Sequence, residues 1–193
     1  MFDHKQIKIP VIVSGTITDA SGRTLSGQTP EAFWISVSHI DLAAVGLNCA
    51  LGAKELRPHL QELAHIAPIP IIAYPNAGLP NELGNYDQGP EEMKEYIKDF
   101  LSEGLVNIIG GCCGTGPEHI RLMAEVAKGF SPRIPLKKEA QSMYCGLEPL
   151  IVRDNMNFIN IGERTNVTGS KKFARLIKED NYFFKHLFLL SPF

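Results

Sequence analysis

The chain has 193 residues, of which 44% are hydrophobic and 21% are charged, and its formal net charge is -2. This composition is typical of a globular protein with one domain or slightly more. The small negative charge, without a cluster of Lys and Arg, excludes a nucleic-acid-binding surface built on phosphate contacts. No apolar run is long enough to cross a bilayer, and the first residues lack a signal peptide's apolar core, so we expect a cytoplasmic protein with no membrane contact.

Four short, nearly continuous apolar runs predict strands that are buried on both faces of a parallel sheet. A helical pattern follows each of these runs, and the runs themselves are Val11–Ile17, Ala44–Asn48, Ile69–Tyr74 and Val106–Ile109. The first helix is expected to begin with Thr29 as its cap and Pro30 in its first position, and to continue to Ile40. The other three are expected around the apolar residues of segments 56–66, 93–101 and 120–127.

Four βα units in about 130 residues fit either a Rossmann-like sheet or half of a (β/α)8 TIM barrel, which needs eight such units. The sequence contains neither a GxGxxG nor a GxxxxGK[ST] phosphate loop, and this weakens the nucleotide-binding alternative. We therefore predict an α/β fold in which residues 1–130 form the second half of a TIM barrel.

The character of the chain changes after residue 130. Prolines interrupt a polar and charged stretch over residues 131–156, which we interpret as a linker. The run Asn157–Ile161 then predicts a strand, and a helix is expected to begin near Ser170. Residues 157–193 are therefore expected to begin a second α/β unit.

Three cysteines lie where predicted strands end. Cys112 and Cys113 follow the fourth strand and precede a helix, and Cys49 follows the second strand. In a barrel, alternate strands contribute side chains to the same layer, so the three thiols are expected to converge. Three thiolates would suit zinc and leave its fourth position for a substrate or water, and the field of the helix N-terminus would favour the thiolate form. From position alone, small buried cysteines at strand ends are an equally good interpretation.

Other polar residues at strand ends or on helices are weaker candidates. Asn76, at the end of the third predicted strand, could bind substrate or occupy the open position of a metal, although a turn role before Gly78 is the simpler interpretation. Cap, turn or packing roles are at least as well supported for the remaining candidates, which are Ser14, Thr16, Asp19, His59, His65, His119 and Cys145.

Several segments resemble the homocysteine S-methyltransferase family and, within it, the cobalamin-dependent methionine synthases. PVIVSGTITDASGRTLSGQT, GLNCALG, YPNAGLPN and GGCCGTGPEHI are similar to the homocysteine-binding barrel of these enzymes. INIGERTNVTGS is similar to the opening of the folate-binding barrel that follows it. GGCCG with an upstream GxNC marks the wider family, and the IGERTNVTGS segment points to the cobalamin enzymes.

The resemblance implies a set of ligands and a reaction. Zinc would be held by Cys49, Cys112 and Cys113, with Asn76 near its open position, and a pterin pocket would begin at Glu163 and Asn166. Homocysteine would bind zinc through its sulfur and attack the methyl group of methylcobalamin, which methyltetrahydrofolate would restore at the second barrel. Two alternatives stay open: a cobalamin-independent, betaine-type homocysteine methyltransferase, and a non-catalytic zinc-binding half-barrel completed by a partner chain.

The chain also departs from the family pattern. It carries four of the barrel's eight units, it lacks the cobalamin module, and its tail NYFFKHLFLLSPF does not resemble the family's continuation. We therefore expect a fragment with little or no activity alone. Its open strand edges would favour self-association or pairing with a complementing chain.

Overall fold

The structure is a computed structural model that describes residues 9–18, 21–137, 141–159 and 171–179. Its contacts divide the chain into two units, Met1–Val152 and Arg153–Phe193. Each unit is described separately.

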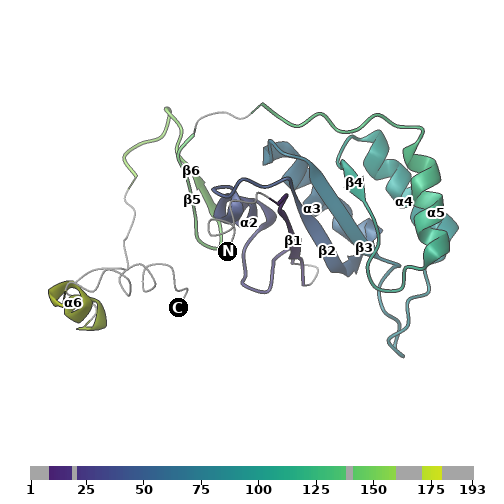
Figure 1. Ribbon diagram of the computed structural model, residues 1–193, viewed down its shortest axis with the longest axis horizontal. Coiled ribbons are helices and arrows are strands. Elements are labelled where there is room, and N and C mark those ends of the chain that lie inside the picture. Colours follow the sequence, from purple (N-terminus) through teal and green to yellow (C-terminus); the bar gives the residue numbers. More distant parts are fainter. Residues whose placement is uncertain (1–8, 19–20, 138–140, 160–170, 180–193) are drawn as a thin grey trace. The chain divides into compact units, whose positions relative to one another are not determined.

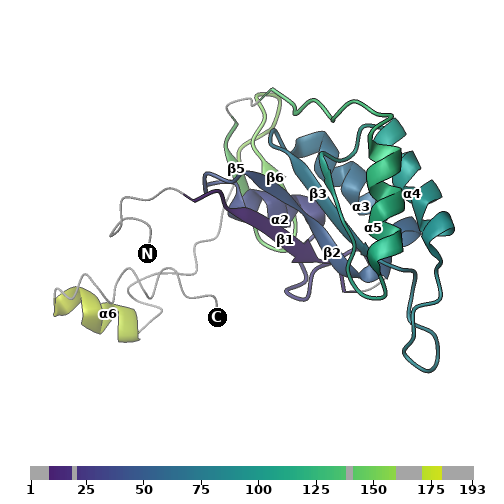
Figure 2. The same ribbon diagram turned by 45° about the vertical axis from the view of Figure 1, so that its right-hand side comes forward.

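The first unit is built on a four-stranded sheet in the order β1-β2-β3-β4, with every neighbouring pair parallel (Figures 1 and 2). Its strands are β1 (Ile12–Thr16), β2 (Ala44–Gly52), β3 (Ile71–Asn76) and β4 (Ile108–Ile109). All four predicted strands are confirmed. The second strand, however, runs four residues past its predicted end, through the segment that contains Cys49.

Helices follow the strands as predicted: α2 (Pro30–Val37), α3 (Ala53–Ile66), α4 (Pro90–Ser102) and α5 (Pro117–Ala127). The cap of α2 is confirmed, because the Thr29 side chain accepts a hydrogen bond from the Ala32 amide at 3.2 Å. The prediction that this helix reaches Ile40 is wrong, since it ends at Val37. The hydroxyl of the next residue, Ser38, donates to the Ile35 carbonyl, a local bond of the kind that competes with continued helix.

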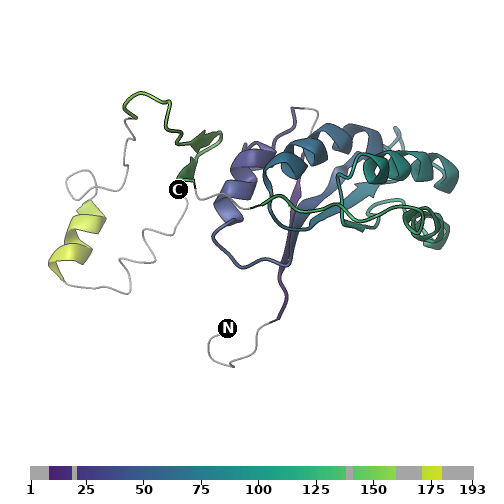
Figure 3. The ribbon, with the colours of Figure 1, turned by 90° about the horizontal axis from the view of Figure 1, so that it is seen from above.

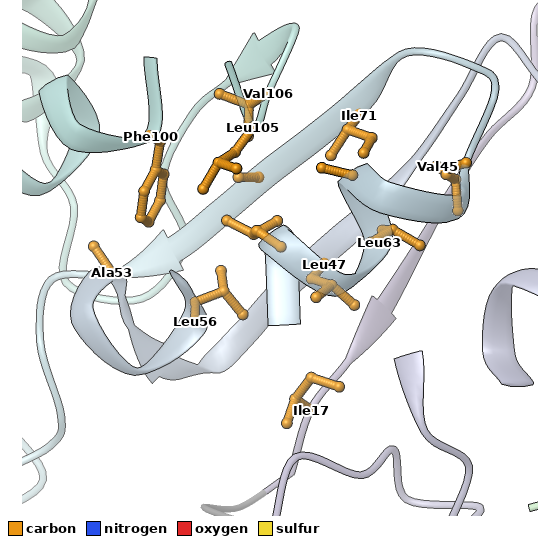
Figure 4. Close-up of a cluster of buried hydrophobic side chains, with 14 of the residues drawn as sticks. Ile17, Val45, Leu47, Ala53, Leu56, Leu63, Ile71, Phe100, Leu105 and Val106 are labelled. Carbon is orange, nitrogen blue, oxygen red and sulfur yellow. The ribbon is translucent and has the colours of Figure 1, made fainter. Parts of the chain in front are cut away.

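The hydrophobic core lies between the sheet and its helices. Val45 and Leu47 of β2 alternate with residues of the opposite face and pack toward α3, as Figure 4 shows, and Ile71 of β3 joins the same cluster. Viewed from above, α2 and α3 lie along one side of the strands (Figure 3). On the opposite face, Ile12 and Ile108 are 48% and 38% exposed.

Strand order distinguishes the two predicted architectures. A Rossmann-like sheet reverses its strand order at a switch point, whereas a barrel adds each new strand beside the last one. The four described strands are added in sequence, without a reversal. The first unit is therefore consistent with part of an α/β barrel. That such a barrel has eight units stays a prediction.

The segment interpreted as a linker contains a β-hairpin. Its strands, β5 (Met143–Cys145) and β6 (Pro149–Ile151), are antiparallel, and Met143 packs with Ile151 against the core beside α2. The Thr29 amide at the start of α2 also donates to the Leu147 carbonyl in the hairpin turn. Residues up to Val152 therefore belong to the first unit. The sequence did not reveal the hairpin because strands of three residues are too short to show a period of two.

Arg133 attaches the beginning of the same segment to the base of the sheet. Its side chain is 7% exposed, and it donates to the carbonyls of Ala64, Ala67 and Ile69 at 2.7, 2.8 and 3.1 Å. The first two carbonyls lie at the C-terminal end of α3, where a cation is favoured by the helix dipole. Arg133 therefore satisfies carbonyls that the helix itself leaves without partners.

We expect Arg133→Met to lower the free energy of unfolding by about 2–3 kcal/mol, because it leaves buried carbonyls without a charged donor. Urea denaturation of the two proteins measures this difference. Lys137→Met is the matched control, since it removes an exposed cation four residues later and should change stability by less than about 0.5 kcal/mol. Equal stabilities for the two variants would show that the Arg133 contacts do not anchor this segment.

The second unit contains one described helix, α6 (Lys171–Lys178), which confirms the helix expected near Ser170. Residues 157–159 of the predicted strand Asn157–Ile161 are not in a strand, and the rest of that strand lies outside the described residues. The assignment of this unit to a pterin-binding barrel stays a prediction. Among the helices that the structure describes, none is long and apolar enough to span a membrane.

Candidate metal centre

Cys49 reaches the site through an irregularity in β2. Strand alternation would point it the same way as Val45 and Leu47, toward the helices. Instead, the pairing of β2 with β3 shifts register between Asn48 and Gly52, and Cys49 has a φ of 56°. Among the described residues it is the only non-glycine with positive φ. Such irregularities are typical of strands that redirect a side chain next to a functional site.

Cys112 and Cys113 lie in a turn that hydrogen bonds attach to the end of β3. The Cys112 amide donates to the Pro75 carbonyl at 2.9 Å, and the Ala77 amide donates to the Cys113 carbonyl at 2.9 Å. Gly114, with a φ of 77°, supplies the left-handed residue that completes the turn. These hydrogen bonds hold both cysteines against β3. In the sheet, β3 lies between β4, which precedes the two cysteines, and β2, which contains Cys49.

Asn76 is buried at the centre of this arrangement, 1% exposed. Its Oδ1 accepts a hydrogen bond from the Cys113 amide at 3.1 Å. Asn76 therefore holds the two-cysteine turn in place from the end of β3. An amide oxygen has a second lone pair, so this bond leaves it one further acceptor position.

The three thiols meet. The Sγ of Cys113 lies 3.5 Å from that of Cys49 and 3.9 Å from that of Cys112, and all three sulfurs lie within 4.8 Å of one another. A tetrahedral zinc ion with bonds of about 2.3 Å holds its sulfur ligands about 3.8 Å apart. The cysteine cluster, defined as Cys49, Cys112 and Cys113, therefore matches the donor type and the spacing of a three-thiolate zinc site. No larger group of metal-ligand side chains occurs among the residues that the structure describes.

The Cys112 thiol resists deprotonation in the absence of a cation. Burial, together with hydrogen bonds from Cys49 and Cys113, raises the pKa of Cys112 to about 11. That the field of the helix N-terminus favours a thiolate stays a prediction, and at Cys112 desolvation and the neighbouring sulfurs act in the opposite direction. A bound cation would reverse this balance, since metal coordination deprotonates a thiol.

Tyr86 also belongs to the site, although no sequence motif indicated it. The side chain of Cys113, together with burial, raises the pKa of Tyr86 above its ordinary value. A Cβ placed on Gly114 would lie 2.3 Å from the Tyr86 Cβ, so the tyrosine packs directly on the two-cysteine turn. The signal that could have found it is the loop between β3 and α4, which is long for a βα connection.

His119 is a structural residue, as predicted. Its Nδ1 accepts the Gly116 amide at 3.1 Å, so its Nε2 is the atom that donates to the Gln88 carbonyl, at 3.0 Å. The imidazole therefore caps α5 and joins it to the end of the loop that contains Tyr86. Both of its nitrogens are used in this way, and neither is available as a metal ligand.

The remaining candidates lie outside the cluster. Ser14 donates to the Asn48 Oδ1 at 2.7 Å, and the Asn48 amide group donates to the Thr16 hydroxyl, so these side chains satisfy one another across β1 and β2. Cys145 is exposed on β5. Asp19, Glu163 and Asn166 lie outside the described residues.

The family model of the homocysteine S-methyltransferases matches residues 1–127, about two thirds of the chain. The chain belongs to the homocysteine S-methyltransferase family. Membership supports a methyl-transfer function with homocysteine as the substrate. The cysteine cluster lies within the matched region, and it is a group of side chains that can hold a metal ion.

The positive φ of Cys49 leads to a prediction about stability. In the metal-free protein, we expect Cys49→Gly to be more stable than Cys49→Ala by about 1 kcal/mol, because glycine adopts a positive φ without the steric cost that alanine retains. Urea denaturation measures the difference, and both variants lack the sulfur, so the comparison isolates the backbone. If alanine proves as stable as glycine, Cys49 is not strained.

Proposed function

We propose that this chain activates the thiol of homocysteine on a zinc ion held by Cys49, Cys112 and Cys113, and that the resulting thiolate accepts a methyl group from methylcobalamin. The observation that carries the proposal is the convergence of three sulfurs, from two separate segments of the chain, within 4.8 Å of one another. Soft sulfur donors favour zinc over Mg²⁺ or Ca²⁺, and three protein ligands leave the fourth position open.

Zinc would supply the charge that converts the homocysteine thiol into a thiolate at neutral pH. The chain's own residues prepare this position. The two-cysteine turn and the irregular end of β2 hold the three sulfurs together before any ligand arrives. Three thiolates already on the ion would keep an added sulfur electron-rich, which preserves its ability to attack a methyl group.

We propose that Asn76 has a second role at the open position of the metal, in addition to holding the two-cysteine turn. Its Oδ1 accepts the Cys113 amide and has one further lone pair available. That lone pair suits either the metal's open position or a group of the incoming substrate. Because the side chain is 1% exposed, its orientation is fixed by packing and by this bond.

The methyl donor is proposed from the sequence of the second unit. The IGERTNVTGS segment resembles the start of a folate-binding barrel, with Glu163 and Asn166 expected in a pterin pocket for methyltetrahydrofolate. This resemblance favours methylcobalamin over betaine as the donor to homocysteine. A non-catalytic zinc-binding role completed by a partner chain is the alternative from another class of protein, and homocysteine binding discriminates against it.

The test is calorimetry on the zinc-loaded chain. Homocysteine is expected to bind with the release of about one proton, because its thiol is deprotonated on coordination. The dependence of the binding heat on the ionisation enthalpy of the buffer measures that proton. Methionine, which has a similar size and no thiol proton, is the matched ligand control and should release none.

Two results would contradict the proposal. In the first, homocysteine does not bind to the zinc-loaded chain. In the second, it binds without releasing a proton. Either result would mean that the zinc site does not activate a thiol. The donor is tested separately, since methionine formation from betaine and not from methylcobalamin would favour the cobalamin-independent class.

A further inference from the structure

We propose that His119 is a positioning residue of the metal centre, whose neutral imidazole donates from Nε2 to the Gln88 carbonyl and thereby fixes the two-cysteine turn. This inference rests on the proposed zinc site. It assigns a role in metal binding to a buried side chain that is not itself a ligand.

The two-cysteine turn depends on neighbouring segments for its position. Residues 110, 111, 114 and 116 are glycines, which lose more conformational entropy on folding than other residues. Residues 110–116, all of which the structure describes, contribute no side chain to the hydrophobic core cluster. Hydrogen bonds to other parts of the chain must therefore hold the turn in one conformation.

These hydrogen bonds form a closed ring that begins and ends at the turn. The Ala77 amide donates to the Cys113 carbonyl at 2.9 Å, and the Gln88 amide donates to the Ala77 carbonyl at 3.2 Å. The Nε2 of His119 donates to the Gln88 carbonyl at 3.0 Å, and its Nδ1 accepts the Gly116 amide at 3.1 Å. Gly116 follows Cys113 by three residues, so the chain itself completes the ring. Within this ring, His119 is the residue that bonds through its side chain.

The ring requires one state of the imidazole. A nitrogen that accepts a backbone N–H carries no proton, so the proton of neutral His119 is on Nε2. The residue is 9% exposed, which leaves water little access to replace that donor at the Gln88 carbonyl. Loss of the Nε2 donor would therefore detach the end of the loop between β3 and α4 from α5.

The consequence for the metal follows from how Cys113 is held. Its amide donates to the Asn76 Oδ1 at 3.1 Å, and its carbonyl accepts the Ala77 amide. The first bond is independent of His119, whereas the second belongs to the ring. A metal site binds more tightly when its ligands are already held in place. Opening the ring should therefore loosen Cys113 without releasing it, and lower its contribution to zinc affinity.

The test compares His119→Gln with His119→Glu in the full chain. Both side chains suit the third position of α5, from which an oxygen can accept the N-cap amide as Nδ1 does. Glutamine also has an NH₂ group that can donate to the Gln88 carbonyl, whereas glutamate has no donor. In chelator competition, we expect glutamine to keep the zinc affinity within about threefold and glutamate to lower it about tenfold.

Amide hydrogen exchange in the metal-free protein measures the ring directly. The Ala77 and Gln88 amides should exchange faster in His119→Glu than in the wild type or in His119→Gln, because both amides donate within the ring. The Ile71 amide, which donates to the Asn107 Oδ1 at the start of β3, should exchange equally in all three proteins.

Ile120→Glu is the matched control for the added charge. Ile120 is 46% exposed on the same helix, so a carboxylate there enters solvent and leaves the imidazole unchanged. Its zinc affinity and its Ala77 exchange should match those of the wild type. If Ile120→Glu weakened zinc binding as much as His119→Glu, charge would explain the loss and the role of His119 would be refuted.

Nitrogen-15 NMR of the wild-type imidazole tests the proposal without any replacement. The His119 ring should show a protonated Nε2 and an unprotonated Nδ1, both before and after zinc is added. A proton on Nδ1, or a nitrogen that binds the added zinc, would refute the ring.

The outcomes separate this inference from the proposed function. If the wild-type chain binds zinc, but both replacements at position 119 keep its affinity or lower it equally, the role of the Nε2 donor is refuted and the zinc site stands. If the folded wild-type chain binds no zinc, both the proposed function and the role of His119 are refuted. Weaker binding and faster Ala77 exchange in His119→Glu alone would support the role.

Discussion

Cys113→Ala is expected to lower the affinity of the chain for zinc by roughly 100- to 1000-fold. Zinc sites with four protein ligands have binding free energies of about 10–16 kcal/mol, so one thiolate contributes about 3–4 kcal/mol. The Sγ of Cys113 lies 3.5 Å from that of Cys49 and 3.9 Å from that of Cys112, so its loss leaves two ligands from separate segments. Competition with a chromophoric chelator measures the affinity.

Cys145→Ala is the control for that substitution. It removes a thiol that is exposed on β5, away from the cysteine cluster, and zinc affinity should match that of the wild type. Circular dichroism of both variants shows whether each one folds. Equal loss of zinc in the two variants, or no loss in either, would contradict the assignment of Cys113 as a ligand.

Gly114→Ala is expected to destabilise the metal-free protein by about 2–4 kcal/mol and to remove high-affinity zinc binding. Two effects add at this position. The backbone has a φ of 77°, which alanine adopts only with strain, and the new Cβ would lie 2.3 Å from the Tyr86 Cβ. Because that atom is attached to the main chain, a rotation of the tyrosine ring cannot relieve the overlap. Urea denaturation and chelator competition measure the two consequences.

Gly84→Ala separates the two effects. Gly84 has a φ of 79°, close to that of Gly114, but a Cβ there would meet nothing within 4 Å. It should therefore show the backbone strain of about 1 kcal/mol without the overlap, and zinc binding should be retained. If Gly114→Ala were no worse than Gly84→Ala, close packing of Tyr86 on the turn would be wrong.

Most of the fold could be predicted because the relevant signals are local. Buried parallel strands appear as continuous apolar runs, and Pro30, Pro90 and Pro117 each mark the first position of a helix. The β5–β6 hairpin could not be predicted in this way. Its strands have three residues each, and its contacts are with α2, which lies more than a hundred residues earlier in the chain.

The site was predicted in part. That Cys49 and the Cys112–Cys113 pair converge follows from strand ends lying at one edge of a parallel sheet. How they converge does not follow. The alternation of β2 would have turned Cys49 toward the core, and the register shift that redirects it has no local signature. Tyr86 was missed because its contact with Cys113 depends on how a long loop closes, through Gln88 and His119.

X-ray absorption at the zinc edge tests the central claim most directly. The zinc-loaded chain is predicted to show three sulfur ligands at about 2.3 Å, and the addition of homocysteine is predicted to raise that number to four. Methionine should leave the number at three. A folded chain with fewer than three sulfurs on its zinc, or with three sulfurs that homocysteine does not change, would contradict the assignment of the cysteine cluster as a site that activates a thiol.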